Sequence, residues 1–325
     1  MVKREGNRKF EEYLAALLPD KSIIALSTYR SGSVLLGSFN DNFGLVWHNW
    51  IHEIPSGMSS TRDTLSIATI DSIKSYSLKK IYRFFRSAYL KHNNSDSRTI
   101  EINALKVQNT GKILCHEICS TSHDLSYLVN TRHSAISTLD NDVFNQQYWM
   151  PPFISEFVPD DLCHLNGLAI RNSVPAFVTC LAGSNLPRGW RLFPSNSGLL
   201  IDIINNKVIS NGLTLPHSPR LVDDRLYFLQ SGISSLCFLD INTEVVVTIA
   251  ELPGFARGMA IVDNHAIIGM STIRNSNLWD SLPVKSKFPN AHPGLVIVDL
   301  KTGCIVSKHY IEDSFFEIFD VQIIP

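Results

Sequence analysis

The sequence predicts an all-β fold, and its repeats indicate a six-bladed β-propeller closed by pairing of the N-terminal hairpin with the C-terminal strand. Three short polar stretches that contain histidine recur about 50 residues apart, which is the length of one four-stranded blade. They are HEIC at 116–119, HLNGLA at 164–169 and HSPR at 217–220. Because each stands where an apolar strand begins, His116, His164 and His217 are predicted to point toward one central channel.

A second recurring pattern is a hairpin that begins with aspartate, at 202–208, 240–245 and 299–304. Asp, Asn and Thr side chains hydrogen-bond to nearby backbone in turns. We therefore expect each hairpin to join the two outer strands of a blade. With the polar stretches, this pattern places six inner strands that begin near residues 56, 116, 164, 217, 257 and 319.

The two ends of the chain each lack part of a blade. The hairpin SIIALSTYRSGSVLLGSF (22–39) turns at residues 30–32 and has no inner strand before it, whereas EIFDVQII (317–324) has no partner strands after it. Pairing of these two segments would close the ring and remove the exposed sheet edges. A seven-bladed ring and an open stack of β-meanders are the alternatives.

Helical spacing precedes the first hairpin. Residues 8–18 carry Phe10, Tyr13, Leu14, Leu17 and Leu18 on one face and are followed by Pro19, which predicts a short amphipathic helix. We therefore divide the chain into an N-terminal helical extension at 1–20 and a single propeller domain at 21–325.

Two segments interrupt the strand pattern. Segment 75–98 has aromatic residues between Lys and Arg; it is interpreted as a blade hairpin with an exposed face and a polar tip, and otherwise as a basic lid or a partner-binding hairpin. Segment 271–294 is predicted to be a long loop between paired strands. Such loops often cover a site, so we interpret it as a lid or specificity loop.

The composition excludes several classes of function. A net charge of -1 and a pI near 6.8 predict no binding of nucleic acid or of an acidic membrane. The chain has neither a spanning apolar stretch nor the apolar core of a secretory signal. Its six cysteines form no C-x-x-C pair, which is typical of reduced thiols in a cytoplasmic protein. The sequence also lacks HExxH, GxSxG, P-loop and GxGxxG motifs.

The predicted channel collects residues suited to metal or anion chemistry. Three imidazoles could hold a divalent transition metal, Fe, Zn or Cu, with Asp320 or Glu117 as a proton-transfer group or a further ligand. Asn166, Arg220 and Arg257 stand at matching points and are predicted to bind substrate. In an extended strand Asn166 would share a face with His164, and Pro219 would hold Ser218 extended.

An interpretation without a metal uses the same residues. His, Asn and Arg around a channel also make a pocket for a sugar, a carboxylate or a peptide end, with Arg220 and Arg257 binding the anion. A purely structural role for the histidines is the third alternative.

At these positions the chain resembles a known family. The strings WMPPFISEFVPDDLCHLNGLAIRN (149–172), GWR (189–191), NGLTLPHSPRLVDDRLYFLQSG (211–232), LPGFARGMA (252–260) and EIFDVQIIP (317–325) resemble motifs of the uncharacterised bacterial DUF4915 proteins. The similarity runs from about Ile23 to the end of the chain. The matching polar residues are His116, Asn130, Thr131, Arg132, His164, Asn166, Trp190, Arg191, His217, Ser218, Arg220, Arg257, Arg274, Glu317 and Asp320.

The resemblance adds Glu317 to the proton-transfer candidates and Arg132, Arg274 and Trp190 to the substrate-binding candidates. The chain departs from the family pattern at Glu117, where the family has Asp, and at Phe316, where it has a second acidic residue. A further departure is His133, because Asn130–His133 stand where the family has TRFS. The three channel histidines are unaffected.

Two main functional hypotheses follow, and a scaffold that uses its outer faces is a third possibility. The first is a metal-assisted enzyme, hydrolytic or oxidative, that acts on a small molecule or peptide in the channel, in natural-product or glycan tailoring. The second is a non-catalytic propeller that binds a peptide or sugar and serves a partner enzyme. Neither hypothesis involves nucleic acid or a membrane.

Overall fold

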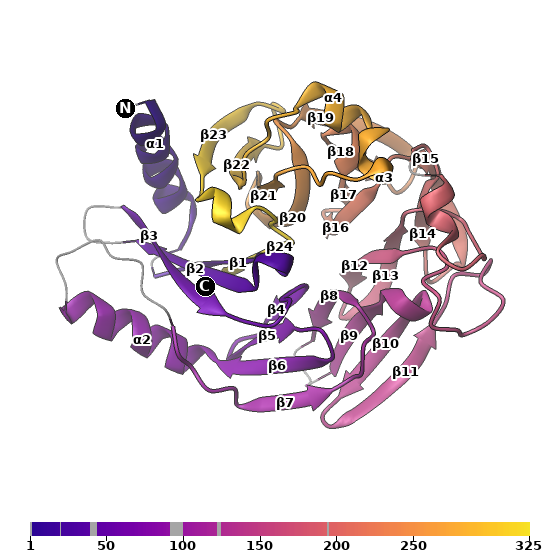
Figure 1. The fold of residues 1–325 in the computed structure, drawn as a ribbon, viewed down its shortest axis with the longest axis horizontal. Helices are drawn as coiled ribbons and strands as arrows, with labels where there is room; N and C mark the ends of the chain where they lie inside the picture. Colours follow the sequence, from indigo (N-terminus) through magenta and orange to yellow (C-terminus); the bar gives the residue numbers. More distant parts are fainter. Residues whose placement is uncertain (1, 20, 40–43, 92–99, 122–124, 194) are drawn as a thin grey trace.

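The strands form a ring of six sheets. The computed structural model describes residues 2–19, 21–39, 44–91, 100–121, 125–193 and 195–325. Its strands make six four-stranded antiparallel sheets around a central axis (Figure 1). The fold is a six-bladed β-propeller, as predicted, and the seven-bladed and open alternatives do not apply.

Each blade has its inner strand at the axis and its fourth strand at the rim. From inside to outside, blades 1 to 3 are β24 (Asp320–Ile324), β1 (Ile23–Ser27), β2 (Ser33–Phe39) and β3 (Leu45–Ile51); β4 (Met58–Ser60), β5 (Thr64–Ala68), β6 (Ser72–Ser77) and β7 (Lys106–Asn109); and β8 (Cys115–Ser120), β9 (Leu125–Asn130), β10 (Ala135–Asp140) and β11 (Val143–Trp149). Blades 4 to 6 are β12 (Leu165–Arg171), β13 (Val174–Cys180), β14 (Gly198–Asp202) and β15 (Lys207–Leu213); β16 (Pro216–Val222), β17 (Arg225–Gln230), β18 (Ser235–Asp240) and β19 (Val245–Glu251); and β20 (Phe255–Val262), β21 (His265–Ser271), β22 (Gly294–Asp299) and β23 (Ile305–Tyr310).

Blade 1 combines both ends of the chain. β24 pairs antiparallel with β1, with Asp320 opposite Ser27 and Ile324 opposite Ile23. The C-terminal strand therefore supplies the inner strand that the N-terminal hairpin lacks.

The aspartate hairpins join the third and fourth strands of blades 4, 5 and 6. In blade 5 the Asp240 carboxylate accepts hydrogen bonds from the backbone N–H of Asn242 and Thr243, both at 3.0 Å. In blade 6 the Asp299 carboxylate does the same for Lys301 and Thr302. These bonds satisfy the turn backbone and explain why aspartate opens each hairpin.

A closed ring of hydrogen bonds from side chains to backbone carbonyls connects the inner parts of all six blades. Each donor lies in one blade and its acceptor in the next, with lengths from 2.6 to 3.0 Å. The pairs are Ser27 to Ser56, Ser56 to Cys115, Thr131 to Leu165, Asn166 to Pro216, Ser231 to Ala256 and Ser271 to Ile318. Because all of these donor side chains are buried, the ring fixes the spacing of the inner strands.

The N-terminal helix covers the joint between the first and last blades. α1 (Val2–Leu17) buries Phe10 and Leu14 fully, in a cluster with Leu35 of blade 1 and Ile267 of blade 6. The Tyr13 hydroxyl lies 2.7 Å from a ring nitrogen of His265. The predicted amphipathic helix is confirmed.

Segment 75–98 differs from the predicted hairpin. It continues from β6 into α2 (Leu78–Lys91), which lies on the outer side of the ring (Figure 1). Leu78, Ile81 and Phe85 are buried against Trp50 and other residues of the first two blades. Their spacing of three and four residues is helical, and this apolar face outweighs the β propensity of the aromatic residues. The polar tip at 92–98 lies outside the described residues.

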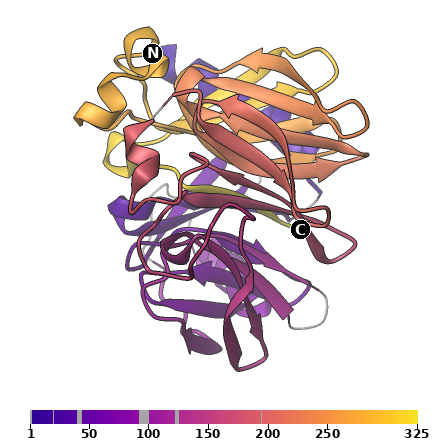
Figure 2. The same cartoon turned by 90° about the vertical axis from the view of Figure 1, so that its right-hand side faces the viewer.

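The long connection at 271–294 contains two short helices, α3 (Asn277–Asp280) and α4 (Pro283–Lys287). In the side view, these helices and the 3₁₀ turn Gly189–Leu192 lie on the same face of the ring (Figure 2). Leu282 and Val284 pack in one cluster with Trp190 of that turn. In the described part of the chain, no helix is long and apolar enough to cross a lipid bilayer.

Candidate functional site

The inner strands of blades 3 to 6 are bulged close to their first residues. The strand pairing shifts between Cys115 and Ile118, between Leu165 and Gly167, between His217 and Arg220, and between Ala256 and Met259. A bulge inserts extra residues and re-aims their side chains. The residues inside the bulges are His116, Glu117, Asn166, Ser218, Pro219, Arg257 and Gly258, so most of the predicted site residues stand at or beside a bulge.

The bulge also changes the conformation of Ser218. Its φ is +52°, which is left-handed and not the extended conformation predicted from the following proline. Its hydroxyl accepts a hydrogen bond of 3.0 Å from the backbone N–H of Gly258 in the next blade. This contact stabilises the bulge.

His116 and His217 occupy equivalent positions in blades 3 and 5. Nδ1 of His116 is 2.8 Å from the Leu114 carbonyl oxygen, and Nδ1 of His217 is 2.9 Å from that of Leu215. Because a carbonyl oxygen only accepts, each Nδ1 carries the proton and Nε2 is left as an acceptor in the neutral ring. Burial, followed by the nearby Arg257 guanidinium, lowers the pKa of both histidines well below the usual value.

His164 occupies a different position. It precedes the first residue of β12 and has a φ of +53°, so it corresponds to Leu114 and Leu215 in their blades and not to the histidines. Its Nδ1 is 2.9 Å from both carboxylate oxygens of Asp161, and its ring lies 4.9 Å from the ring of His116. The expectation that it shares a strand face with Asn166 is wrong, because His164 is not in the strand.

Asp161 was not identified from the sequence. It is nearly buried, has a φ of +50°, and accepts a hydrogen bond of 2.9 Å from the Trp190 indole N–H in addition to the one from His164. The Trp190 ring in turn packs against the His164 ring in a tilted arrangement, with the ring centres 4.3 Å apart. The available signal was an acidic residue three positions before His164 in the loop 158–164.

The structure does not support the metal site predicted at His116, His164 and His217. Among the residues described, no group of three His, Cys, Asp or Glu side chains is arranged so that it could hold a metal ion. The physical reason is the offset of His164, whose ring is directed by Asp161 and packs against Trp190. The presence of a divalent transition metal stays a prediction.

Arg257 and Phe319 lie beside these histidines. The Arg257 guanidinium carbon is 3.4 Å from the centre of the Phe319 ring, and that ring lies 5.1 Å from His116 and 4.8 Å from Tyr29. Arg257 is only 8% exposed, and its Nη2 is buried with no hydrogen-bond partner in the described structure. Burial lowers the pKa of Arg257 to about 10, so the group remains a cation at neutral pH. We call the end of the channel formed by His116, His164, His217, Arg257 and Phe319 the axial mouth.

Glu317 and Arg274 line a small cavity next to Arg257. This cavity has a volume of about 10 Å³. It is also bounded by Phe255 of β20 and by Trp279 of the 271–294 segment. Glu317 is buried and forms ion pairs with Arg30, at 2.9 Å, and with Arg274. Its carboxylate is therefore neutralised by two cations and is not free to bind a ligand cation.

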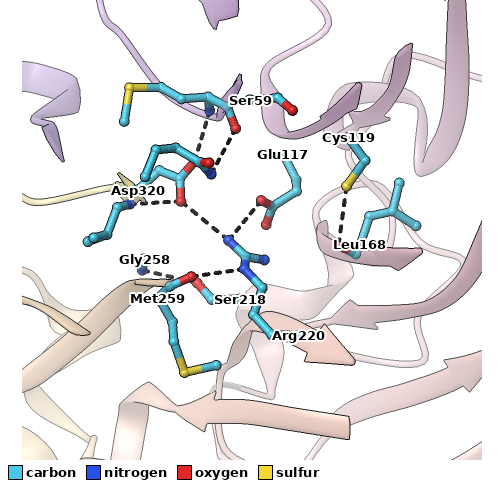
Figure 3. Close-up of polar contacts among 12 residues, drawn as sticks. Ser59, Glu117, Cys119, Leu168, Ser218, Arg220, Gly258, Met259 and Asp320 are labelled. Carbon is cyan, nitrogen blue, oxygen red and sulfur yellow. Dashed lines mark hydrogen bonds and ion pairs between the residues drawn. The ribbon is translucent and has the colours of Figure 1, made fainter. Parts of the chain in front are cut away.

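Arg220, Glu117 and Asp320 form a buried ionic network further along the inner strands (Figure 3). Arg220 Nη2 lies 3.1 Å from Glu117 and 3.4 Å from Asp320, and Arg220 Nε donates to the Met259 carbonyl at 2.8 Å. Asp320 also accepts from the backbone N–H of Met58 at 2.9 Å. Arg220, Glu117 and Asp320 come from blades 5, 3 and 1, so the network connects three alternate blades around the channel.

Burial governs the protonation of this network. It raises the pKa of Glu117 to about 8 although Arg220 opposes the change, and it also raises the pKa of Asp320. The two carboxylates in turn raise the pKa of Arg220. Arg220 is thus occupied by protein partners, which differs from its predicted role in binding a substrate anion.

Asn166 is also satisfied within the protein. Its Nδ2 donates to the Pro216 carbonyl at 2.9 Å, and its Oδ1 accepts from the Thr179 hydroxyl at 2.6 Å. It belongs to the hydrogen-bond ring between blades, which leaves little of its amide for a ligand.

Arg132 lies near Asp161, the partner of His164, because the Asp161 backbone N–H donates to the Arg132 carbonyl at 2.8 Å. It lines a cavity of about 490 Å³ together with Leu114, Pro159, Asp160, Asp161, Pro187, Arg188 and Arg191. The Arg191 guanidinium lies 5.0 Å from the Trp190 ring. Arg132 and Trp190, both suggested by the family motifs, are thus close to His164.

The fold and site define a β-propeller with a polar, partly cationic mouth on its axis. The sequence profile described as "Domain of unknown function (DUF4915)" matches residues 11–325. The chain belongs to this family.

Comparison with other known proteins adds only fold information. No curated protein matches the chain. The chain is similar to a protein in the crystal structure of a nidogen/laminin complex, with a TM-score of 0.59, 10% sequence identity and coverage of 93% of this chain and 98% of that chain. The likeness to the computationally designed Ika8 protein has a TM-score of 0.39 and 8% identity, covering 86% of this chain and 71% of that one. At such low identity these likenesses carry no argument about function.

Proposed function

We propose that the axial mouth binds a small organic anion, such as a carboxylate or a phosphate ester. The observation that carries this proposal is the buried Nη2 of Arg257, which has no partner among the described residues. Leaving a buried donor without a partner costs about 1–3 kcal/mol, and the cost is higher for a charged group. A bound anion oxygen would supply the missing hydrogen bond. The cavity beside Arg257, of about 10 Å³, has room for one such oxygen atom.

The two equivalent histidines add the opposite kind of hydrogen-bonding group. Their Nε2 atoms accept hydrogen bonds in the neutral ring, and their lowered pKa keeps them neutral at pH 7. A ligand that carries hydroxyl or amide donors beside its anionic group is complementary to this arrangement. The aromatic rings of Tyr29, Phe255 and Phe319 supply an apolar surface near the same point.

A metal-assisted enzyme is the second candidate. The observation that favours it is the engagement of Nδ1 in all three histidines by a carbonyl or carboxylate, which is typical of metal-binding imidazoles. The arrangement of the side chains favours anion binding, because no group of three metal ligands is assembled among the described residues. Elemental analysis of the protein purified without oxygen separates the two candidates: about one equivalent of Fe, Zn or Cu favours the enzyme.

Calorimetric titration with citrate, succinate and inorganic phosphate tests anion binding. We expect at least one of these anions to bind the wild-type protein and to raise its Tm, since a ligand at 100 times its Kd stabilises the folded state by about 2.7 kcal/mol. Arg257→Gln should lose this binding at least tenfold. Arg225→Gln is the matched control, because Arg225 is an exposed arginine stacked on Phe238 in blade 5.

Folding of the variant has to be checked separately, because Arg257 is buried. Arg257→Lys keeps the charge and should retain weakened binding, and circular dichroism of both variants reports whether the propeller persists. Unchanged anion affinity in a folded Arg257→Gln variant would overturn the proposal.

A further inference from the structure

The cavity next to Asp161, the partner of His164, has an excess of positive charge that the protein itself does not neutralise. Arg132, Arg188 and Arg191 line it, and none of the three forms an ion pair within the described structure. Two carboxylates also line it. That of Asp161 already accepts from His164 and Trp190, which leaves only the exposed Asp160.

The backbone that carries Arg188 and Arg191 is tightly constrained. Arg188 has a φ of +49°, and its backbone N–H donates to the Asp160 carbonyl at 3.0 Å. The next residue, Gly189, has no room for a side chain, because a Cβ there would lie 2.0 Å from the Ser184 hydroxyl oxygen. Arg191 is stacked on the buried Trp190 ring.

The same cavity adjoins the axial mouth. Leu114 lines it and offers its carbonyl oxygen to His116, while Asp161 lines it and bonds to His164. Ring contacts connect the two sides: Arg257 lies on Phe319, the Phe319 ring lies 5.1 Å from His116, and the His116 ring lies 4.9 Å from His164. The volume of about 490 Å³ is within the usual range for small-molecule sites, whereas the space beside Arg257 is far smaller.

We propose that the cavity lined by Arg132, Arg188 and Arg191 is a second anion subsite, so that the mouth takes a small ligand with an anionic group at each end. This inference rests on the proposed function and names its ligand class: a molecule such as a doubly phosphorylated or doubly acidic sugar. One anionic group meets Arg257, the other meets the three arginines, and hydroxyl groups between them face the Nε2 acceptors.

Titration with fructose 1,6-bisphosphate and fructose 6-phosphate tests the second subsite. The wild-type protein should bind the bisphosphate at least tenfold more tightly, and the difference should shrink as the salt concentration rises. The double variant Arg132→Gln/Arg191→Gln should lose this advantage and bind both sugars with the affinity of the monophosphate. Arg225→Gln should behave as wild type.

The outcomes separate the two proposals. Equal affinities for the two sugars in the wild-type protein, or an unchanged preference in the double variant, would overturn the second subsite, as would the absence of bisphosphate binding at 10 mM. A double variant that loses the preference for the bisphosphate would support the second subsite. If Arg257→Gln leaves anion affinity unchanged in the same experiment, the proposed role of Arg257 is overturned while the second subsite stands. Because all three arginines of the subsite are at least partly exposed, the double variant is expected to fold.

Discussion

His116 and His217 stand at the same point of blades 3 and 5, and each donates its Nδ1 proton to the carbonyl oxygen two residues earlier in the chain. The accepting residues, Leu114 and Leu215, have left-handed φ values of +53° and +50°. The turn before the inner strand therefore orients the imidazole, and no other blade carries a histidine at this position in the described structure. The shared geometry indicates a shared role as hydrogen-bond acceptors at the axial mouth.

The buried state of these histidines makes folding sensitive to acid. Their pKa is lowered on folding, so their contribution to stability is complete above the unfolded value near 6.5 and is lost as the pH falls below it. His116→Gln/His217→Gln removes both titrations. Its free energy of unfolding, measured with urea, should fall less than that of the wild type between pH 7.5 and 5. Equal decreases in the free energy of unfolding of the wild type and the double variant over this pH range would contradict the prediction.

The wild-type protein should still lose stability in acid through other groups. Burial also lowers the pKa of His52 and of His309 to about 4. The free energy of unfolding of the double variant is therefore still expected to decrease in acid, but less steeply than that of the wild type.

Glu117 should give a pH dependence of the opposite sign. Its pKa rises from 4.5 to about 8 on folding, so the folded state gains a proton, and this stabilisation is complete below pH 4.5 and lost as the pH rises through 8. Gln keeps an oxygen acceptor for Arg220 but does not titrate. The stability of Glu117→Gln relative to wild type should therefore increase from pH 5.5 to 8.5. A constant difference over this range would show that Glu117 is ionised throughout.

Much of the fold follows from local sequence. The aspartate hairpins and the polar stretches before the inner strands depend on contacts within a few residues, which is why the predicted starts near 116, 164, 217 and 257 fall within two residues of the observed strands. α2 was missed because its basic and aromatic composition was weighed more heavily than the helical spacing of Leu78, Ile81 and Phe85.

The site was less predictable, because bulges break the alternation of strand faces. An inner strand read with period two puts His164 and Asn166 on one face, but the observed strand begins after His164 and is bulged at Asn166. The partners of Arg220 come from residues about a hundred positions away, and no local pattern pairs them. Asp161 was visible only as one acid in a polar loop.

The hydrogen-bond ring between blades should contribute measurably to stability. In Ser231→Ala the Ala256 carbonyl loses its donor, and His217 loses one acceptor for Nδ1. Removing a buried hydrogen bond in this way costs about 1–3 kcal/mol. Ser286→Ala is the matched control, since Ser286 is exposed and bonds only within its own helical turn, and its effect should stay within about 0.5 kcal/mol. Equal unfolding free energies for the two variants would contradict a structural role for the ring.

Gly258 is a position where a single added methyl group should be strongly destabilising. Its φ is +75°, and a Cβ there would lie 2.7 Å from the Cα of Asp320. Gly111 has nearly the same φ, +68°, but a Cβ there would meet nothing within 4 Å. Gly111→Ala thus reports the cost of the left-handed conformation alone, about 1 kcal/mol, whereas Gly258→Ala adds a clash with backbone that cannot move without breaking the Arg220–Asp320 contact. We expect Gly258→Ala to lower the unfolding free energy by about 4 kcal/mol or more, or to prevent folding. Similar losses in the two alanine variants would mean that the inner strands of blades 6 and 1 are further apart than this geometry requires.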